Sequence, residues 1–235
     1  MSNTSLVLQE QPLISFVLLA YNQEAFISEA VKSALDQTYE PLEIILSDDF
    51  STDDTFEIMK RIAAEYNGPH HIILNRNSKN IGIGSHVNAL MELAEGEVIV
   101  AAGGDDISFP KRVQEVANEF FRRRHKPYSV WSSAIYIDAD GKVLDRKFAL
   151  PVQPLTDTIM MRNTHPIIGA AHAWSREVFD VFGPLLPSVI FEDNAISFRS
   201  YLLGEIAFIN NDLVYYRRHS NNVTNFLSTA DHRAL

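Results

Sequence analysis

Two pairs of adjacent carboxylates carry the clearest chemistry in this sequence. Asp48-Asp49 and Asp105-Asp106 each follow a short apolar run, and two glycines precede the second pair. Hard cations such as Mg2+ or Mn2+ bind one or two protein carboxylates and complete their shell with water and substrate phosphates. Glycine lets the backbone approach a ligand closely. Asp105-Asp106 is therefore a candidate metal site, and an Asp-rich turn that caps the next helix is the alternative.

Tyr21 and Asp49 are candidates for binding a planar base. An aromatic face can stack on a base, and a carboxylate at a strand end can accept hydrogen bonds from a base or a ribose hydroxyl. The alternative for Tyr21 is an aromatic residue at the edge of the core. The alternative for Asp48-Asp49 is a loop that caps the following helix, in which Ser51 and Asp54 have the spacing of a capping box.

A third group of candidates lies in the second half of the chain. Glu192-Asp193 stands at the predicted start of a helix, where the helix dipole is expected to lower the pKa of a carboxylate. Such a carboxylate could still act as a general base on an attacking hydroxyl. His219 could ligate a metal or contact a phosphate, and its alternative is a structural or solvated histidine.

Apolar runs that alternate with amphipathic segments must position these groups. Strands are predicted at 13–20, 42–46, 71–74 and 97–102, and each is followed by a helix, the last of which begins near Pro110. Such alternation predicts right-handed crossovers and a largely parallel sheet, in which ligands bind at the carboxyl ends of the strands. The clusters at these strand ends should therefore converge on one crevice.

The second half reads as α+β. An alternating strand is predicted at 130–137, before a hairpin turn at Asp140-Gly141. A strand at 167–174, a helix at 192–203 and a last strand at 213–216 follow. The segment 145–165 is expected to be a loop that orders only with ligand.

Composition and charge exclude several classes of function. Lys and Arg total 20 against 30 Asp and Glu, a formal charge of −10, so a nucleic-acid partner is not expected, and the basic run 122–126 is interpreted as a solvated helix end. No cysteine is present, which excludes disulfides, thiolate zinc sites and a cysteine nucleophile. With neither a signal peptide nor a transmembrane segment in the sequence, a cytoplasmic location is expected, with peripheral contact at the inner membrane face left open.

In their order along the chain, these motifs resemble those of glycosyltransferase family 2, inverting enzymes with the Rossmann-like GT-A nucleotide-diphospho-sugar fold. The motifs that carry the resemblance are Tyr21-Asn22-Gln23-Glu24, Asp48 to Asp53, Asn80-Ile81-Gly82, Gly103-Gly104-Asp105-Asp106, Glu192-Asp193 and Arg217-Arg218-His219. The resemblance implies an α/β fold, with a mostly parallel central sheet flanked by helices and a smaller α+β acceptor-side half. It implies a single GT-A domain over 1–235, with a nucleotide-sugar-binding half at about 12–110 and an acceptor-binding half at about 111–235.

The resemblance also implies residue roles. Tyr21 would stack on the base, Asp49 would hydrogen-bond it and Asp48 would support their loop. Asp105 and Asp106 would hold Mn2+ or Mg2+ at the diphosphate of the donor. Asp193 would be the general base. The other implied nucleotide-sugar contacts are Asn22, Glu24, Asn80, Gly82, Asp105, Glu192 and His219.

Two positions depart from the family pattern. Gly103 stands where the metal motif commonly has an acidic residue, which leaves the ion with fewer protein ligands. His86-Val87-Asn88 stands where many relatives have a basic residue before an asparagine.

The expected function is metal-dependent inverting transfer of a sugar to a hydroxyl of a glycan, lipid-linked or other acceptor, in surface polysaccharide assembly. A UDP-sugar is preferred as donor, with a dTDP-sugar next. The alternative is a catalytically silent nucleotide-sugar-binding partner protein. A nucleotidyltransferase ranks last, because residues 20–23 lack the Gly-rich basic loop that holds a triphosphate.

Overall fold

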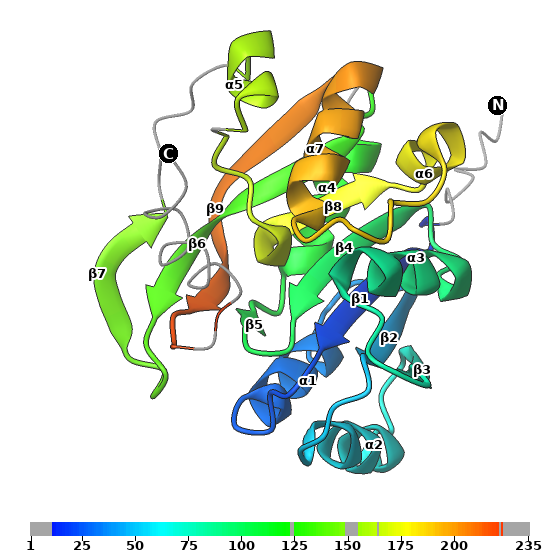
Figure 1. The fold of residues 1–235 in the computed structure, drawn as a ribbon, viewed down its shortest axis with the longest axis vertical. Coiled ribbons are helices and arrows are strands. Elements are labelled where there is room, and N and C mark those ends of the chain that lie inside the picture. The colour runs from blue at the N-terminus through cyan, green and yellow to red at the C-terminus, as the bar shows by residue number, and fades with distance from the viewer. Residues whose placement is uncertain (1–10, 123–124, 149–154, 164, 221, 223–235) are drawn as a thin grey trace, which may run out of the picture.

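The computed structural model of the chain describes residues 11–122, 125–148, 155–163, 165–220 and 222 (Figure 1). At its centre is a nine-stranded sheet in the order β3-β2-β1-β4-β8-β6-β9-β5, and β7 pairs with β6. The strands are β1 (Ile14–Ala20), β2 (Leu42–Asp48), β3 (His71–Arg76), β4 (Val98–Gly103), β5 (Ile107–Ser108), β6 (Ser129–Ile137), β7 (Val143–Phe148), β8 (His172–Ser175) and β9 (Ile206–Arg217).

Helices cover both faces of this sheet. They are α1 (Ile27–Leu35), α2 (Thr55–Glu65), α3 (Ile83–Leu93), α4 (Arg112–Phe121), α5 (Asp157–Met161), α6 (Glu177–Phe182) and α7 (Glu192–Leu203), with a 3-10 turn, η1 (Gly169–Ala171). Figure 1 shows α3, α6 and α7 on the side of the sheet nearer the viewer. No helix among the described residues has the length and apolarity needed to cross a bilayer.

The four strands β3, β2, β1 and β4 run parallel, as the alternation of strands and helices predicted. In the register of β1 with its neighbours, Ala20 lies opposite Asp48 and Leu19 lies opposite Gly103. The carboxyl ends of β1, β2 and β4 therefore line up. This alignment places three polar clusters at the same end of the parallel strands: Tyr21-Asn22, Asp48-Asp49 and Asp105-Asp106.

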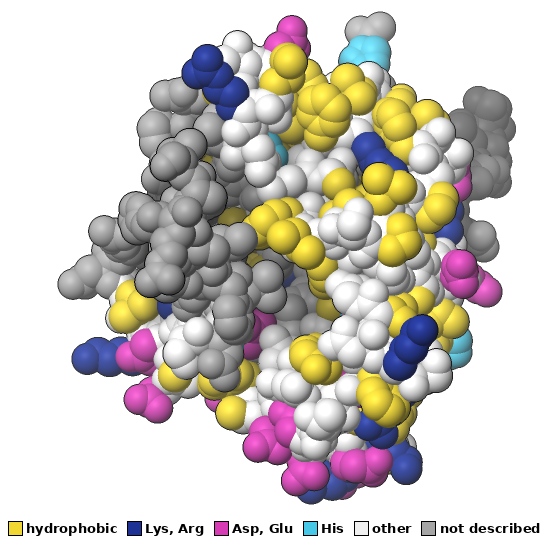
Figure 2. Space-filling model, in the orientation of Figure 1, with side chains coloured by type: hydrophobic (Ala, Val, Ile, Leu, Met, Phe, Trp, Pro, Cys, Tyr) yellow, Lys and Arg dark blue, Asp and Glu magenta, His cyan; other side chains and the backbone are white. Residues whose placement is uncertain are grey.

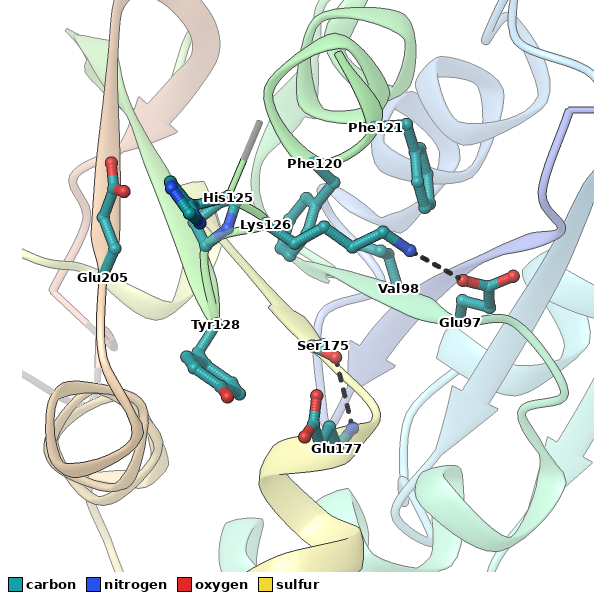
Figure 3. A pocket seen from close by; sticks show the side chains of 11 residues that line it. Glu97, Val98, Phe120, Phe121, His125, Lys126, Tyr128, Ser175, Glu177 and Glu205 are labelled. Atoms are coloured by element: carbon teal, nitrogen blue, oxygen red, sulfur yellow. Dashed lines mark hydrogen bonds and ion pairs between the residues drawn. The ribbon is translucent and has the colours of Figure 1, made fainter. Parts of the chain in front are cut away.

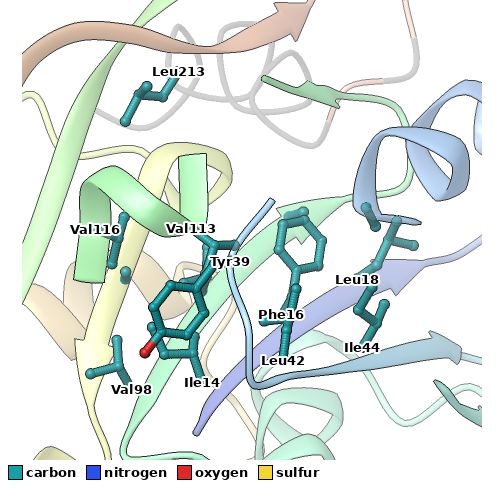
Figure 4. Packing of buried hydrophobic residues seen from close by; sticks show 14 of the residues in the cluster. Ile14, Phe16, Leu18, Tyr39, Leu42, Ile44, Val98, Val113, Val116 and Leu213 are labelled. Atoms are coloured by element: carbon teal, nitrogen blue, oxygen red, sulfur yellow. The ribbon is translucent and has the colours of Figure 1, made fainter. Parts of the chain in front are cut away.

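Two apolar layers hold the sheet between its helices. Phe16 and Leu18 of β1 face the cluster formed with α1, α2 and α4 (Figure 4), whereas Val17 faces the cluster formed with α3, α6 and α7. Because successive side chains of a strand point to opposite faces, strands buried on both sides must be apolar at nearly every position. This explains the mostly hydrophobic runs at 13–20 and 42–46.

Beyond β4 the strand directions become mixed. β8 is antiparallel to both β4 and β6, while β6 is parallel to β9. The predicted hairpin turn at Asp140-Gly141 joins β6 to β7, and Asp138 Oδ1 accepts hydrogen bonds from the amides of Asp140 and Lys142. β6 does not alternate as predicted, because its first six residues are all buried.

Three predictions for the second half were wrong. The strand predicted at 167–174 is instead η1 followed by β8, because the amide of Gly169 donates to Asp193 rather than to a strand. The last strand begins at Ile206 rather than 213, because β9 pairs with β6 across an irregularity that accommodates the polar residues 210–212. The predicted loop 145–165 contains the end of β7 and all of α5, while 149–154 and 164 lie outside the described residues.

Candidate active site

The turn after β4 brings the carboxylates of Asp105 and Asp106 together. The amide of Gly104 donates to Leu19 O at 2.9 Å, which ties the turn to β1. A Cβ atom at Gly103 would lie 2.8 Å from Asp105 Oδ1 and 2.9 Å from Asp106 Oδ2. The two oxygens therefore face the same space above Gly103. The residue that departs from the family pattern is the one that leaves this space open.

Asp106 is buried between two buried arginines. Its Oδ1 accepts a hydrogen bond of 2.8 Å from the amide of Arg217, and the guanidinium of Arg112 also favours its charged form. Burial and the neighbouring charge of Asp105 nevertheless raise the pKa of Asp106 well above its ordinary value. Burial also lowers the pKa of Arg112 to about 9. A divalent cation beside Asp105 and Asp106 would relieve the repulsion between their carboxylates.

Arg217 supports the Asp105-Asp106 turn from the interior. Its Nε donates to Asp105 O at 2.9 Å and its Nη1 to Ala139 O at 3.0 Å, while Nη2 pairs with Glu29. The guanidinium also lies over the ring of Phe26, 4.9 Å from its centroid. Sequence reasoning named Arg217 only as part of a closing motif. These side-chain hydrogen bonds join residues 78 to 188 positions apart, so no local pattern could reveal them.

His219 contacts the same turn. Its Nε2 lies 2.9 Å from Asp105 Oδ2, which also accepts a bond of 3.2 Å from Asn222 Nδ2. The imidazole packs against Phe26, with ring centroids 4.7 Å apart. The structure thus joins two predicted site residues, His219 and Asp105, that are far apart in the sequence.

The donor set of this turn fits a hard divalent cation that is only partly coordinated by protein. Asp105 and Asp106 offer two converging carboxylate oxygens. In the part of the chain that the structure describes, no three or more His, Cys, Asp and Glu residues are arranged to hold a metal ion. A cation here would therefore need water and substrate oxygens to complete its shell, as Mg2+ commonly does.

The loops after β1 and β2 are tied to each other by predicted site residues. The backbone amide of Asn22 donates to Ser51 Oγ at 2.8 Å. The side-chain Oδ1 of Asn22 accepts from the backbone amide of Thr52 at 2.8 Å. Glu24 Oε2 accepts from the amide of Asp54 at 3.0 Å. Asn22 and Glu24 therefore hold the two loops together in this structure.

Asp48 is fully buried and bonds within this pair of loops. It accepts hydrogen bonds from the amide and the hydroxyl of Ser51, and Arg76 Nε lies 3.3 Å from its Oδ2. The predicted capping box was wrong for the same reason. Asp54 is the N-cap of α2 without a side-chain bond, and the hydroxyl of Ser51 is engaged by Asp48 and Asn22 instead.

Asp49 joins the end of β2 to the start of α3. Its Oδ1 accepts from Asn77 Nδ2 at 2.8 Å and from the amide of Ile81 at 3.0 Å, and its Oδ2 accepts from the amide of Gly82 at 3.0 Å. Asn80 Oδ1 also accepts from the amide of Gly82, at 3.1 Å. Gly82 has φ of +77°, a conformation that favours glycine. Gly82 is the residue before α3, whereas Gly84 lies within that helix.

Two exposed aromatic residues stand beside these loops. Tyr21 is 45% exposed and Phe50 is 43% exposed. Asn22 (φ 51°) and Phe50 (φ 64°) both adopt the left-handed region. Such outliers cluster at functional sites, since the surrounding structure must compensate for their cost. Phe50 was missed by sequence reasoning, because phenylalanine gives no signal for this conformation.

Glu192 and Asp193 begin α7. Asp193 Oδ2 accepts from the amide of Gly169 at 3.1 Å, and its Oδ1 accepts from the amide of Asn194 at 2.8 Å. A Cβ atom at Gly169 would lie 2.6 Å from Glu192 Oε1. The 3-10 turn η1 packs against β4, the strand that ends in Gly103. Glu192 and Asp193 therefore approach the same part of the sheet as the Asp105-Asp106 turn.

The predicted lowering of these pKa values by the helix dipole was wrong. Burial raises the pKa of Glu192 to about 8, with a further contribution from the charge of Asp193. Burial also raises the pKa of Asp193, against the opposing effect of its backbone hydrogen bonds. Loss of solvent outweighs the dipole because the dipole provides only a fraction of a charge at a helix end. A carboxylate with a raised pKa is a stronger base.

The side chains of the molecule are unevenly distributed over the face in Figure 2. Hydrophobic side chains gather over α6 and α7, and acidic ones gather over α2. The predicted solvated end of α4 is confirmed for Arg122, His125 and Lys126, which are exposed, while 123–124 lie outside the described residues.

A cavity of about 460 Å³ lies at the opposite end of β4, where that strand begins (Figure 3). Phe120, Tyr128 and Glu177 line it together with Val98, the first residue of β4. Lys126 crosses it to pair with Glu97 at 3.6 Å. Because β4 ends at Gly103, the cavity and the carboxylate turn occupy opposite ends of one strand. None of the predicted site residues lines this cavity.

Solved structures share this fold. The chain aligns with TarS from S. aureus in complex with UDP-GlcNAc at a TM-score of 0.70 and 18% identity, covering 89% of this chain and 59% of that one. It aligns with the mannosyltransferase PcManGT from Pyrobaculum calidifontis, in complex with GDP-Man and Mn2+, at a TM-score of 0.66 and 15% identity, covering 97% and 66%. These matches show the mixed α/β GT-A fold that the sequence predicted.

Comparison with protein sequences shows the family of this chain. The chain is 33% identical over 126 residues to the putative glycosyltransferase EpsE from Bacillus subtilis, covering 54% of this chain and 44% of that protein. It is 32% identical over 174 residues to chondroitin synthase from Escherichia coli, covering 73% and 24%. It thus spans less than half the length of either relative. A family model described as Glycosyl transferase family 2 matches residues 15–183, well over half of the chain, and the protein therefore belongs to glycosyl transferase family 2.

Proposed function

We propose that this chain transfers a sugar from a nucleoside-diphosphate donor to a hydroxyl of an acceptor, with inversion at the anomeric carbon. The observation that carries the proposal is the convergence of Asp105 and Asp106 above Gly103, in register with the loops after β1 and β2. Relatives named as a putative glycosyltransferase and as chondroitin synthase support a role in polysaccharide synthesis. We also propose that both halves form one GT-A domain, since one sheet passes through them.

Asp193 is the proposed general base. It would take the proton of the acceptor hydroxyl while the oxygen of that hydroxyl bonds to the anomeric carbon. The bond from this carbon to the diphosphate would break on the opposite face. The raised pKa of Asp193 supports this role, because proton transfer is most efficient when the pKa of the base approaches the working pH.

The donor would lie along the carboxyl ends of β1, β2 and β4. Tyr21, which is exposed, would stack on the base, and Asp49 would accept a hydrogen bond from it. Asp105 and Asp106 would hold Mn2+ or Mg2+, which when bound supplies Lewis-acid stabilisation of the charge on the leaving diphosphate. His219 and Glu192 would contact the diphosphate and the sugar. A UDP-sugar is the preferred donor and a dTDP-sugar the next.

A thermal-shift comparison of UDP, dTDP and GDP, each with Mn2+ and with EDTA, tests the donor site without an acceptor. A ligand present at 100 times its dissociation constant adds about 2.7 kcal/mol to the free energy of unfolding. For a chain of this size that corresponds to a rise in Tm of roughly 5 to 10 °C. A Mn2+-dependent shift that disappears in Asp105→Asn supports the proposal.

The other outcomes separate the alternatives. Absence of a shift with every diphosphate would overturn the proposed function. Binding of a nucleotide sugar without transfer, over a broad panel of hydroxyl acceptors, would instead identify a silent binding partner. A transfer rate unchanged in a folded Asp193→Asn variant would overturn the role of that residue.

A further inference from the structure

A chain of polar side chains, buried at His86, Ser47 and Asp49 and partly buried at Asn75 and Asn77, connects α3 to Asp49. His86 of α3 is 2% exposed, and its Nε2 lies 2.6 Å from Ser47 Oγ in β2. Asn75, which lies opposite Ser47 in β3, donates through Nδ2 to the same hydroxyl oxygen at 2.9 Å. A buried histidine is unusual in this helix, because its neighbours Val87 and Leu90 belong to an apolar cluster.

The chain of contacts continues to the carboxylate of Asp49. Asn75 Nδ2 also lies 3.4 Å from Asn77 Oδ1, and Asn77 Nδ2 donates to Asp49 Oδ1 at 2.8 Å. Three side chains therefore link His86 to Asp49: those of Ser47, Asn75 and Asn77. Buried networks in which every member is bonded specify a single geometry, because each unsatisfied group would be costly.

The same helix turn is also held at its start. Asp49 accepts hydrogen bonds from the amides of Ile81 and Gly82, and the amide of His86 donates to Gly82 O at 2.8 Å. The first turn of α3 is thus attached to β2 at two points, through Asp49 before the turn and through His86 after it. A displacement of the Asp49 contacts would therefore shift the His86 contact, and a displacement of the His86 contact would shift Asp49.

The hydrogen bonds of Ser47 fit a neutral His86. Ser47 Oγ accepts from Asn75 Nδ2, and with Nε2 of a neutral imidazole as the acceptor, the Ser47 hydroxyl donates to His86. The ring hydrogen of His86 would then be on Nδ1. Burial lowers the pKa of His86, against the opposing charges of Asp49 and Asp48. A neutral imidazole at pH 7 is consistent with this assignment.

We infer that His86 is a positioning residue, which orients Asp49 toward the nucleobase of the donor through Ser47, Asn75 and Asn77. The inference rests on the proposed function, in which Asp49 contacts the base. It adds to that function a residue that does not touch the donor yet sets its affinity and base preference. A purely structural His86 would contribute to stability and leave nucleotide selectivity unchanged.

The test compares two substitutions of His86 with a matched control. In His86→Leu the acceptor for Ser47 is lost, whereas in His86→Gln the amide oxygen can take the place of Nε2. His70 serves as the control, since it is also buried and its Nε2 contacts a backbone oxygen, Gln37 O, at 2.8 Å, away from Asp49. The dissociation constants for UDP, dTDP and GDP with Mn2+ are measured by calorimetry, together with Tm.

His86→Leu is expected to weaken UDP binding about tenfold, the loss typical of one misaligned hydrogen bond to a charged group, and to narrow the preference for UDP over GDP. His86→Gln is expected to stay within about threefold of the parent protein. His70→Leu is expected to lower Tm and leave both the affinity and the preference unchanged. With a sugar donor, the KM for the donor should rise in His86→Leu while the KM for the acceptor stays constant.

Equal UDP affinity in folded His86→Leu and in the parent would overturn the inference and leave the proposed function intact. An equal loss in His86→Leu and His70→Leu would also overturn it, because general destabilisation would then be the cause. If His86→Leu does not fold, Ser47→Ala interrupts the same chain with a smaller change, and unaltered UDP binding in that variant would contradict the inference. A parent protein that binds no nucleotide would overturn the proposed function as well.

Discussion

Replacing Gly103 with alanine tests the convergence of the two carboxylates directly. The new Cβ atom would lie 2.8 Å from Asp105 Oδ1 and 2.9 Å from Asp106 Oδ2, and ordinary contacts begin at 3.4 Å. Each oxygen would have to retreat by about 0.5 Å to restore an ordinary carbon–oxygen contact. Neither carboxylate moves freely, since Asp106 is bonded to the amide of Arg217 and Asp105 to His219.

The displacement has two costs. Loss of the bond from the Arg217 amide to Asp106 would lower the free energy of unfolding by about 1.5 to 3 kcal/mol, the range for hydrogen bonds to charged groups. The two carboxylate oxygens would also no longer face a common point. The Mn2+-dependent part of the UDP thermal shift should therefore shrink to less than half. Gly103→Asp should not improve binding, because it adds a third like charge to the same space.

Gly68→Ala is the matched control, because the nearest atoms to its Cβ atom would belong to the side chain of Tyr66, in the segment between α2 and β3. Thermal unfolding with UDP, at increasing Mn2+ concentrations and with EDTA, measures both effects in one experiment. The control should retain the full Mn2+-dependent shift. A Gly103→Ala protein with the same Mn2+ response as the parent would show that the two carboxylates do not act together, and the reasoning would fail.

Further predictions concern the base, the buried carboxyls and the aromatic platform. Asp193→Asn should lower the transfer rate by about 10²- to 10⁴-fold, the usual contribution of a general base, with unchanged UDP binding by calorimetry. Since the pKa of Glu192 is raised in the fold from 4.5 to about 8, its contribution to stability is present at low pH and is lost as the pH rises through 8. The Tm of Glu192→Gln should therefore fall less between pH 5 and pH 9 than that of the parent, in a pH series of thermal melts. Arg217→Met should lower the free energy of unfolding by about 1 to 3 kcal/mol in urea titrations, because the carbonyl of Asp105 loses its hydrogen-bond donor, whereas the Glu29 side chain is 60% exposed and is solvated by water. Tyr21→Ala should weaken UDP binding by about 1 to 3 kcal/mol if the ring stacks on the base, and an unchanged dissociation constant would exclude that contact.

Much of the first half of the fold could be predicted from the sequence. The parallel strands appear as mostly apolar runs because both of their faces are buried, and polar residues mark the points where they end. The second half was harder to predict. η1 interrupts a predicted strand because the amide of Gly169 serves Asp193, and β9 extends past polar residues because β6 pairs with it. Both effects depend on partners distant in the sequence.

The candidate site divides in the same way. Asp105, Asp49 and Asp193 could be found as carboxylates at predicted element ends, since residue type and position are local properties. The buried roles of Arg217 and His86 could not, because an arginine or histidine in an isolated sequence carries no sign of what surrounds it. The direction of the pKa shift in Glu192 was also beyond reach, since desolvation depends on how the whole fold covers the carboxyl.

The sequence by itself determined which groups are available and in what order. Element type follows from the spacing of apolar residues, and strand ends follow from where that spacing stops, so Asp105 and Asp49 were placed at strand ends from local information. Only the tertiary structure decided how these groups meet. The common space above Gly103, the buried arginine beneath it and the polar chain from His86 to Asp49 arise from packing between distant segments. Distances and burial are properties of the assembled fold, and they set the charge and direction of every group in the site.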